Sequence, residues 1–382
     1  MRSFLRQNLV CPMCKGDFDL QVFAGSEEEI EHGILRCEPC RLIYPIFGRV
    51  PVMLIYGTPI HADFERRFAD RLSNIGSYRF PQRPPPRGER HVQQSFSLEW
   101  EGLLDDQLTF ALTADELYQL HRDAYMNLDD DDYSHEVRTV LNLGCGAGKE
   151  SEILSRIFSR ADVLAVDINF SVMSAPRRYS GNKKLHFVLA SIFALPFRNR
   201  CADQVFTQGV IHHTHSTKEA FDRLVPMVRV GGHFFVWVYG KDDYLSAPPG
   251  TRALALTLWA MEIVLRPIVC RLPAMPQKAT IHMLALLTYF PSRSRLRHKQ
   301  HWKLKNEVHA CFDKFAPRYA WRHGANEVVE WFENAGFTCR HQSPRKFRKI
   351  FGRRIFGTGI NGHLPAAVAL TKVDELVAGT AL

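Results

Sequence analysis

Apolar and polar residues alternate in blocks through the middle of the chain. Five apolar runs have the length of buried strands: residues 139–143, 162–167, 185–190, 203–208 and 233–239. Three helix-like segments lie between most of these runs: residues 149–159, 171–179 and 217–229. Strands that alternate with helices predict an α/β fold, in which a doubly wound, mostly parallel sheet carries helices on both faces.

The alternation stops after Tyr239 and resumes near residue 325. Two apolar helix-like segments fill the gap, at residues 254–270 and 279–290. Beyond it the pattern predicts one helix and two strands, at residues 325–335, 337–342 and 365–372. An insertion between two late elements of a sheet is a natural place for a cap that covers a substrate. We therefore divide this part of the chain into a core at 96–240, a helical cap at 241–324 and the C-terminal part of the sheet at 325–382.

The first apolar segment of the cap leaves more than one interpretation open. An ordinary pair of buried helices is the simplest, but the same segment could close over an apolar substrate or touch a membrane surface. The longest apolar stretch, 253–265, is interrupted by Glu262 and is too short to span a bilayer. The first residues show no apolar leader segment, so we expect a cytoplasmic protein without a transmembrane span.

The positive charge of the chain is local. Of 382 residues, 49 are lysine or arginine and 40 are aspartate or glutamate, which gives a net charge of +9. Two runs without acidic residues, 293–305 and 345–354, carry six positive charges each, so the rest of the chain is net negative. Such a field favours an anionic partner: nucleic acid, a phosphorylated substrate or an acidic membrane surface. Two solvated faces would give the same pattern.

The N-terminal part of the chain is built around cysteines. Residues 1–56 contain two C-x-x-C pairs, and the Pro-rich residues 57–95 are expected to form a linker. Two such pairs can place four thiolates tetrahedrally around one Zn²⁺. The predicted ligands are Cys11, Cys14, Cys37 and Cys40. Since cysteine fills all four positions, no site is left for water, and the zinc should be structural.

The cysteine unit also resembles a known family. The segments CPMCKG and GILRCEPCRLIYPIFGRVPVML, within residues 9–55, resemble the zinc ribbon of the small activating partner of tRNA and protein methyltransferases. The resemblance implies a small zinc-ribbon domain in front of the α/β domain.

A glycine-rich turn follows the first strand of the core. The sequence VLNLGCGAG, at 140–148, has the strand–turn–helix context of a nucleotide-binding turn. Asp167 ends the next strand, about 20 residues further on, where a carboxylate can accept both hydroxyls of a ribose. The turn and the acid fit both NAD and S-adenosylmethionine. No P-loop pattern is present.

Other segments of the sequence distinguish between NAD and S-adenosylmethionine. VLNLGCGAG, AVDIN, LASIFALPFRNRCADQVFTQGVIHHT and VRVGGHFFVWVYG, in this order over residues 140–240, resemble the class I S-adenosylmethionine-dependent methyltransferases of the type 11 group. QSFSLEW at 94–100 and FDKFAPRYAWRHGANEVVEWFENAGF at 312–337 extend the resemblance to a bacterial subgroup linked to surface-glycan and natural-product biosynthesis. The resemblance implies a seven-stranded, Rossmann-like sheet. It also implies a set of cofactor-binding residues: Asn142, Gly144, Cys145, Gly146, Gly148, Asp167, Ile168, Ser191, Ile192 and Gln208.

Two of these positions depart from the family pattern. Asn142 replaces an aspartate, so it carries no charge to meet the ammonium group of the cofactor. Ser191 replaces the aspartate that holds the adenine amino group, and its side chain reaches less far. Both changes predict weaker cofactor binding, and a non-catalytic copy of the fold remains an alternative.

Four residues are candidates for the acid–base chemistry of the acceptor: His213, Tyr239, Tyr319 and His323. His213 follows the fourth strand of the core, near the expected methyl donor, and histidine titrates near neutral pH. For Tyr239, Tyr319 and His323, a purely structural role in packing is an equal alternative. We expect a methyltransferase that acts on a small-molecule, sugar or lipid intermediate. An RNA methyltransferase and a non-catalytic partner protein remain the alternatives.

Overall fold

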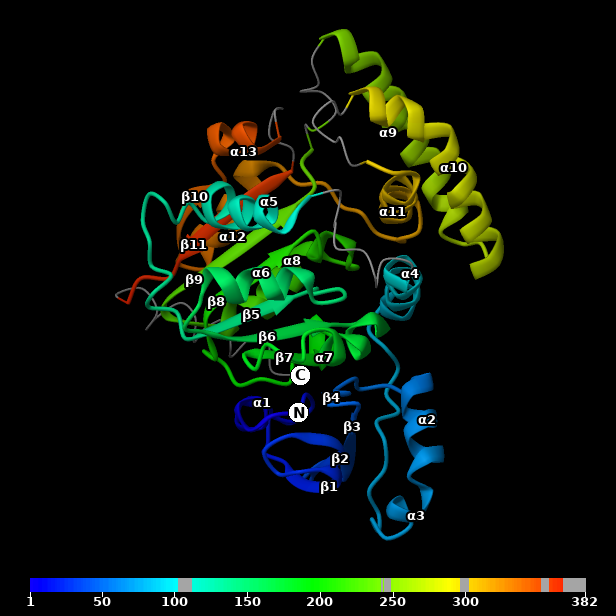
Figure 1. Ribbon diagram of the computed structural model, residues 1–382, viewed down its shortest axis with the longest axis vertical. Coiled ribbons are helices and arrows are strands. Elements are labelled where there is room, and N and C mark those ends of the chain that lie inside the picture. Colours follow the sequence, from blue (N-terminus) through cyan, green and yellow to red (C-terminus); the bar gives the residue numbers. More distant parts are fainter. Residues whose placement is uncertain (102–111, 242, 244–248, 296–301, 352–356, 367–382) are drawn as a thin grey trace.

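The computed structural model describes residues 1–101, 112–241, 243, 249–295, 302–351 and 357–366 of the chain. Figure 1 shows three regions: a small N-terminal unit, a central sheet covered by helices, and a group of helices that projects from one side. The N-terminus lies near the junction of the first two regions (Figure 1).

The central sheet has seven strands in the order β10-β11-β9-β8-β5-β6-β7. Their bounds are Thr139–Leu143 for β5, Asp162–Asp167 for β6, Leu185–Leu189 for β7, Ala202–Gln208 for β8, Val228–Val238 for β9, Thr338–His341 for β10 and Thr358–His363 for β11. Strands β5 to β9 are parallel, whereas β11 runs antiparallel to both β9 and β10. The predicted fold class is therefore confirmed, including the seven-stranded sheet that the resemblance implied.

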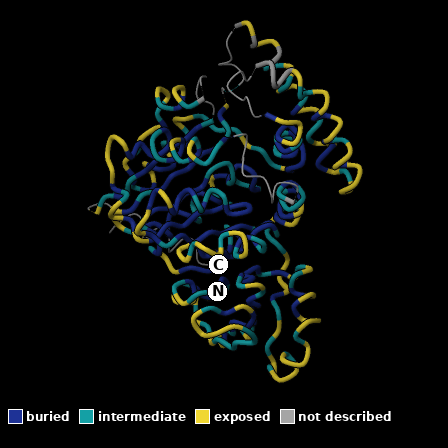
Figure 2. Tube along the Cα trace, in the orientation of Figure 1, coloured by how far each residue is buried: buried dark blue, intermediate teal, exposed yellow. Residues whose placement is uncertain are grey.

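Both faces of this sheet are buried, as the continuous apolar strands require. Side chains alternate between the faces, so that Leu141 and Leu143 belong to one core cluster and Val140 to another. Figure 2 shows the sheet as the most deeply buried part of the chain. The first cluster packs on α8 (Thr217–Leu224) and α12 (Ala325–Asn334). The helices on the other face are α5 (Ala114–Gln119), α6 (Lys149–Ile157), α7 (Ala175–Arg178) and α13 (Pro344–Phe351).

The last strand is not where the sequence pattern placed it. The apolar run at 365–372 was expected to be a strand, but residues 365 and 366 are outside any strand, and 367–372 lie outside the described residues. The strand that pairs with β9 is instead β11, whose sequence is TGINGH. This segment has no apolar run, and it is buried because it inserts between β9 and β10.

The N-terminal unit is a four-stranded antiparallel sheet preceded by α1 (Ser3–Asn8). Its strands are β1 (Asp19–Gly25), β2 (Ile30–Cys37), β3 (Leu42–Phe47) and β4 (Val50–Pro51). Part of the segment expected to be a linker is helical, because it contains α2 (Pro59–Arg67) and α3 (Ala69–Leu72). Phe64 of α2 packs on Ile34 and Ile43 of the ribbon.

The ribbon docks on the free edge of the central sheet. Val52, just after β4, forms a parallel bridge with Leu189 of β7, and the Met53 amide donates to the Leu189 carbonyl at 2.8 Å. The Val10 amide donates to the Pro196 carbonyl at 2.9 Å. Apolar residues of the ribbon and of the sheet belong to one continuous core cluster. The two domains are therefore joined by backbone pairing and by shared burial.

The projecting helices form the predicted insertion. They are α9 (Pro249–Val269), α10 (Ala274–Arg295) and α11 (Leu304–Phe315), and α11 packs against both of the others. A small core of Val269, Ile281, Leu284 and Phe312 holds them together. Helix α4 (Glu89–Glu101) follows the ribbon and the linker in the chain and contacts α11 of the insertion (Figure 1). Among the described residues, no helix has the length and hydropathy needed to cross a bilayer.

Candidate functional site

The glycine-rich turn joins β5 to α6 in a conformation that requires glycine. Gly144, Gly146 and Gly148 have φ values of +78°, +54° and +96°, in the left-handed region that favours glycine. A Cβ on Gly146 would lie 2.9 Å from the Trp100 ring, and one on Gly144 would lie 2.2 Å from Val210. The turn is therefore a tight cradle in which the backbone approaches its surroundings more closely than any other residue type would allow.

Asp167 at the end of β6 faces this turn. Its Oδ2 accepts a hydrogen bond from the Gly146 amide at 2.6 Å, and its Oδ1 accepts one from the Asn169 amide at 2.8 Å. Burial raises the pKa of Asp167 to about 6, although these hydrogen bonds oppose the shift. The carboxylate is thus fixed beside the cradle and is ionised at neutral pH.

Helix α4 covers the turn from the other side. Trp100 packs over Gly146, and Glu89, at the start of the helix, accepts a hydrogen bond from Ser191 Oγ at 2.5 Å. The second carboxylate oxygen of Glu89, Oε1, is buried, and the Tyr56 hydroxyl is a hydrogen-bond partner of this carboxylate. Burial raises the pKa of Glu89 to about 7. A carboxylate from outside the core therefore stands where Ser191 replaces the acid of the family pattern.

These residues line one large cavity. It has a volume of about 520 Å³ and extends from the glycine-rich turn to the inner side of the helical insertion. Its lining contains eight acidic residues and four lysine or arginine residues. The acidic residues are Glu89, Glu99, Glu150, Asp167, Asp243, Glu262, Glu307 and Asp313. Burial raises the pKa of Glu99 well above its usual value, whereas Asp167 and Asp313 remain ionised at neutral pH and favour a cationic ligand.

The predicted cofactor residues surround the turn in two layers. Gly144, Cys145, Asp167, Ile168, Ile192 and Gln208 line the cavity. Gln208 Oε1 is buried and has no hydrogen-bond partner in the described part of the chain, so it is available to a ligand. Asn142 lies behind the turn, where its Nδ2 donates to Ser151 Oγ at 2.9 Å. Gly146, Gly148 and Ser191 shape the site without lining the cavity.

The four candidates for acid–base chemistry fall into two pairs. His213 and Tyr239 line the cavity, whereas Tyr319 and His323 do not. The His323 ring is held by Glu327 Oε1 at 2.8 Å and by Thr217 Oγ1 at 2.9 Å. The Tyr319 side chain packs on Gly88, and its carbonyl oxygen lies 2.8 Å from His213 Nδ1. Neither residue lines the cavity, and of these two described residues only Tyr319 contacts His213, through its carbonyl oxygen.

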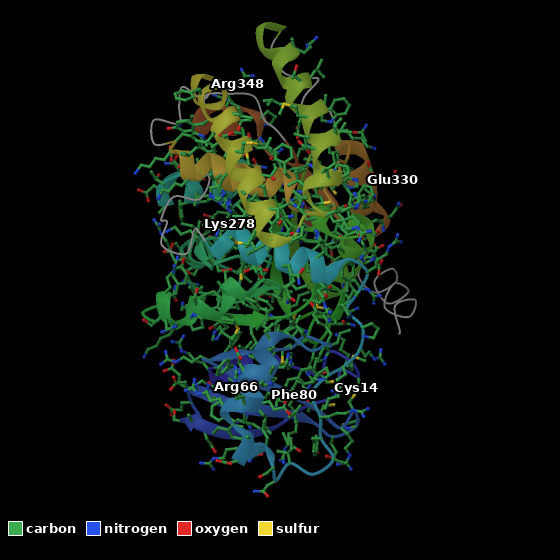
Figure 3. The ribbon with its side chains drawn as sticks, turned by 90° about the vertical axis from the view of Figure 1, so that its right-hand side faces the viewer. Cys14, Arg66, Phe80, Lys278, Glu330 and Arg348 are labelled. Carbon is green, nitrogen blue, oxygen red and sulfur yellow. The ribbon has the colours of Figure 1, made fainter. Side chains whose placement is uncertain are left out.

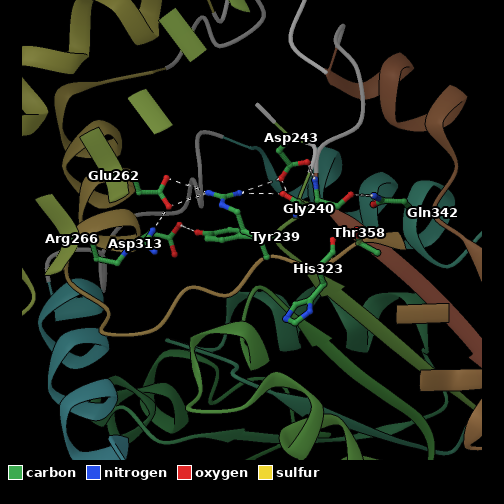
Figure 4. A network of polar contacts seen from close by, with 11 residues as sticks. Tyr239, Gly240, Asp243, Glu262, Arg266, Asp313, His323, Gln342 and Thr358 are labelled. Atoms are coloured by element: carbon green, nitrogen blue, oxygen red, sulfur yellow. Dashed lines mark hydrogen bonds and ion pairs between the residues drawn. The ribbon is translucent and has the colours of Figure 1, made fainter. Parts of the chain in front are cut away.

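Asp313, which the sequence did not single out, connects the two lining candidates. Its Oδ1 lies 3.5 Å from His213 Nε2. Its Oδ2 accepts a hydrogen bond from the Tyr239 hydroxyl (Figure 4). Burial alone would raise the pKa of Asp313, but the contacts with His213 and Tyr239 lower it to about 2. Burial and the Asp313 charge raise the pKa of Tyr239 well above its usual value. Asp313 is therefore an anion held between a phenol and an imidazole.

The insertion is fastened to this site by a second polar network. Arg322 Nη2 donates to Glu262 Oε1 at 3.1 Å and lies 3.3 Å from Oε2, while Nη1 donates to the Gly240 carbonyl at 3.4 Å (Figure 4). Arg266 Nε donates to the Lys314 carbonyl at 2.7 Å. These contacts connect α9, α11 and the end of β9, so the wall of the cavity formed by the insertion is fixed to the sheet.

The four predicted zinc ligands come together in the ribbon. Their Sγ atoms all lie within 4.8 Å of one another. Cys11 and Cys40 Sγ are 4.0 Å apart, and Cys14 and Cys37 Sγ are 3.4 Å apart. A tetrahedral zinc site with Zn–S bonds of about 2.3 Å has S···S distances of about 3.8 Å. The arrangement therefore fits one Zn²⁺ bound by four thiolates.

Two protein families match separate parts of the chain. Residues 141–236 match the methyltransferase domain, and residues 7–48 match the Trm112p-like protein family. The chain carries a methyltransferase domain and a Trm112p-like domain. The first match covers β5 to most of β9, and the second covers the zinc ribbon with all four cysteines. S-Adenosylmethionine is accordingly the cofactor of the methyltransferase domain, and zinc is the metal of the Trm112p-like domain.

Individual relatives resemble the methyltransferase domain. Malonyl-[acyl-carrier protein] O-methyltransferase of Legionella pneumophila is 30% identical over 108 residues, which are 28% of this chain and 38% of that protein. tRNA U34 carboxymethyltransferase of Geobacter sp. (strain M21) is 29% identical over 129 residues, 32% of this chain and 39% of that protein. The chain spans well under half of the length of both relatives.

A solved structure also resembles the chain at low sequence identity. A chain of the complex between the Haloferax volcanii Trm112 methyltransferase activator and a methyltransferase covers 72% of this chain and 98% of its own length. The TM-score is 0.42 and the sequence identity is 14%.

The site fits S-adenosylmethionine in three respects. The glycine cradle admits a closely approaching ligand, Asp167 can accept the hydroxyls of a ribose, and the acidic cavity suits a sulfonium cation. Gln208 adds a buried oxygen atom, Oε1, that has no hydrogen-bond partner among the described residues. The residues that sequence reasoning missed, Glu89, Trp100 and Asp313, all lie outside residues 141–236.

Proposed function

We propose that this protein transfers a methyl group from S-adenosylmethionine to a small-molecule, glycan or lipid biosynthetic intermediate. The observation that carries the proposal is the single cavity that contains both the cofactor-binding residues and the polar residues of the insertion. The cavity extends beyond the turn to the inner sides of α9 and α11, which leaves room for an acceptor beside the cofactor. We further propose that the protein is cytoplasmic, because none of its described cysteines forms a disulfide bond.

Three groups of residues would hold the cofactor. Asp167 would accept the ribose hydroxyls, and the amides of the glycine-rich turn would meet the methionine end. The Glu89 carboxylate would accept a hydrogen bond from the adenine amino group, since Glu89 and Ile192 both line the cavity and Ser191 Oγ holds one of the carboxylate oxygens. On this reading Glu89 replaces the missing aspartate of the family pattern, and Ser191 orients it.

The bound cofactor supplies an activated methyl group, so the protein mainly has to position the acceptor in line with it. His213, Tyr239 and Asp313 lie together at the cavity wall. His213 Nδ1 faces the Tyr319 carbonyl, which leaves Nε2 on the side of Asp313. We assign this His213–Asp313 pair to the removal of a proton from an acceptor hydroxyl or ammonium group. Tyr319 and His323 would position His213 and the neighbouring backbone.

The basic run at 345–354 gives little support to an RNA substrate. Lys346 pairs with Asp129 at 2.6 Å and with Asp130 at 2.7 Å, so part of its charge is neutralised within the chain. Phe347, in the same helix, is buried. Residues 352–354 lie outside the described residues, as do 296–301 of the first run.

Calorimetric titration with S-adenosylmethionine tests the proposal. We expect micromolar binding to zinc-replete protein and a loss of binding in Asp167→Ala. No binding by the wild type would indicate a non-catalytic partner protein instead. Incubation with methyl-labelled cofactor and separate RNA, lipid and small-molecule fractions would then identify the acceptor class. Label in the RNA fraction alone would overturn the proposed substrate.

A further inference from the structure

The outer side of α9 and α10 is unusually apolar. Nine of the twelve large hydrophobic residues that are exposed in the described part of the chain lie on these two helices. Eight of them have exposed fractions between 52% and 78%, and we call them the outer face: Ile263, Val264, Ile268, Met275, Met283, Leu286, Leu287 and Phe290. An apolar surface of this extent marks an interaction site.

The outer face follows from the helical spacing of the two segments. On α10, Met283 and Leu287 are four residues apart, as are Leu286 and Phe290, which places all four on one side. Leu284 and Ala285 turn the other way, into the small core of the insertion. Figures 1 and 2 show that both helices project from the body of the protein with exposed residues along their outer sides.

The charge of the same segment identifies the partner. From residue 244 to residue 306 the chain has one acidic residue, Glu262, which is buried and bound to Arg266 and Arg322. On α9, α10 and the turn between them, the described exposed cations are Arg252, Arg271 and Lys278, whereas Arg266 is bound to Glu262. Figure 3 shows Lys278 on α10, on the side of the molecule that carries the insertion. Apolar residues flanked by cations match the surface of an anionic bilayer.

A second copy of the chain fits this surface less well. A two-fold dimer would place the same patch of each copy against the other. The exposed cations Arg252, Arg271 and Lys278 would then be brought together, with no acidic residue of this segment other than the buried Glu262 to offset them. We propose that the outer face of α9 and α10 binds the surface of a bilayer that contains anionic phospholipids.

This surface bears on the substrate. The inner side of the insertion lines the cavity, through Glu262 of α9 and Glu307 of the neighbouring helix α11. Binding of the outer face to a bilayer would place the cavity next to a source of lipid acceptors. This last step rests on the proposed methyltransferase activity, whereas binding to the bilayer does not.

Vesicle flotation of the full, zinc-replete chain tests the proposal. We expect binding to vesicles of phosphatidylcholine mixed with phosphatidylglycerol, weaker binding to phosphatidylcholine alone, and a decrease of the binding to the anionic vesicles as salt is raised. Leu287→Glu should lower the partition coefficient about tenfold or more, because one buried apolar side chain contributes at least that much. Ile263→Glu with Leu287→Glu should abolish binding. Val230→Glu, which changes an exposed residue of β9 in the same way, should bind as the wild type does.

Calorimetry with S-adenosylmethionine on the same variants separates this proposal from the proposed function. Retained cofactor affinity with lost flotation supports the membrane surface, whatever the acceptor is. Equal flotation with both kinds of vesicle would overturn the anionic part of the proposal. No flotation by the wild type would overturn all of it, as would a dimer, seen by light scattering, that Leu287→Glu dissociates.

Discussion

Ser191 donates a hydrogen bond to Glu89 at 2.5 Å, across 102 residues of sequence. Ser191 follows β7 inside the methyltransferase domain, whereas Glu89 begins α4 outside it. The pair brings a carboxylate to the place where the family pattern has an aspartate. The site therefore recovers by long-range contact a charge that the local sequence lacks.

Removal of the Glu89 carboxylate should weaken cofactor binding. We expect Glu89→Ala to reduce the affinity for S-adenosylhomocysteine about tenfold or more, because a hydrogen bond to a charged group is worth about 1.5–3 kcal/mol. The same variant should lose the preference for S-adenosylhomocysteine over its inosine analogue, which lacks the adenine amino group. Calorimetry measures both. Glu65→Ala, at an exposed position on α2, is the matched control. An unchanged preference would show that Glu89 does not contact the adenine.

Cofactor affinity should depend on pH. Burial raises the pKa of Glu89 to about 7 and that of Asp167 to about 6, and only the ionised carboxylates accept hydrogen bonds from the cofactor. Affinity is therefore nearly full at pH 8 and is lost as the pH falls through the two pKa values. We expect a decrease of about ten- to twentyfold between pH 8 and pH 6. The affinity of Glu89→Gln should change less over the same pH range. Because the ligand's own amino group titrates in the same way with both proteins, the comparison of the variant with the wild type removes its contribution. The same dependence of affinity on pH in the wild type and in Glu89→Gln would contradict the assignment of Glu89 to cofactor binding.

A methyl group on Gly146 should disturb the cradle. The Cβ of Gly146→Ala would lie 2.9 Å from the Trp100 ring, at a φ of +54° that costs about 1–2 kcal/mol for other residues. We expect cofactor affinity to fall at least tenfold by calorimetry, with Trp100→Phe restoring part of it. Gly181→Ala has nothing within 4 Å of the new Cβ and should bind normally. Equal affinities for the two alanine variants would refute the role of this contact.

The ribbon should bind one zinc ion per chain. Cys37→Ser removes one thiolate, so zinc content by mass spectrometry should fall and the ribbon should unfold at a lower temperature, since metal binding stabilises such a small fold. Cys339→Ser changes a cysteine of β10, outside the cluster, and should keep the metal. Zinc retained at full stoichiometry by Cys37→Ser would show that the cluster is not its site.

The Arg322–Glu262 pair should contribute to the stability of the insertion. Glu262 is 3% exposed, and its removal would leave Arg322 without this carboxylate. We expect Glu262→Ala to lower the free energy of unfolding by about 3–5 kcal/mol in urea denaturation. Glu262→Leu combined with Arg322→Met should recover part of the loss. Glu330→Ala, at an exposed site on α12, should change stability little. A loss no larger than that of Glu330→Ala would exclude a stabilising role for the pair.

The central strands could be predicted from the sequence because they are buried on both faces. β5 and β6 match the expected runs, 139–143 and 162–167, residue for residue. A continuous apolar run is the direct consequence of burial in a parallel sheet. β11 escaped prediction because its residues, TGINGH, are small or polar and become buried only through pairing with β9 and β10.

The residues of the site also divide into those that the sequence predicted and those that it did not. Asp167 and the glycine-rich turn were predictable because they are close in sequence and occur in a fixed strand–turn–helix context. Glu89 and Asp313 were not, because each acts through a partner far away along the chain, Ser191 and His213 respectively. No spacing in the sequence encodes those two contacts.

The pairing of Val52 with Leu189 has a consequence for the protein without its metal. An edge strand with free backbone groups is a template for other strands, and β7 is such an edge until the ribbon covers it. The ribbon in turn depends on the four cysteines for its fold. Zinc bound some distance from the cavity therefore protects the central sheet against aggregation, and zinc starvation would first appear as insoluble protein.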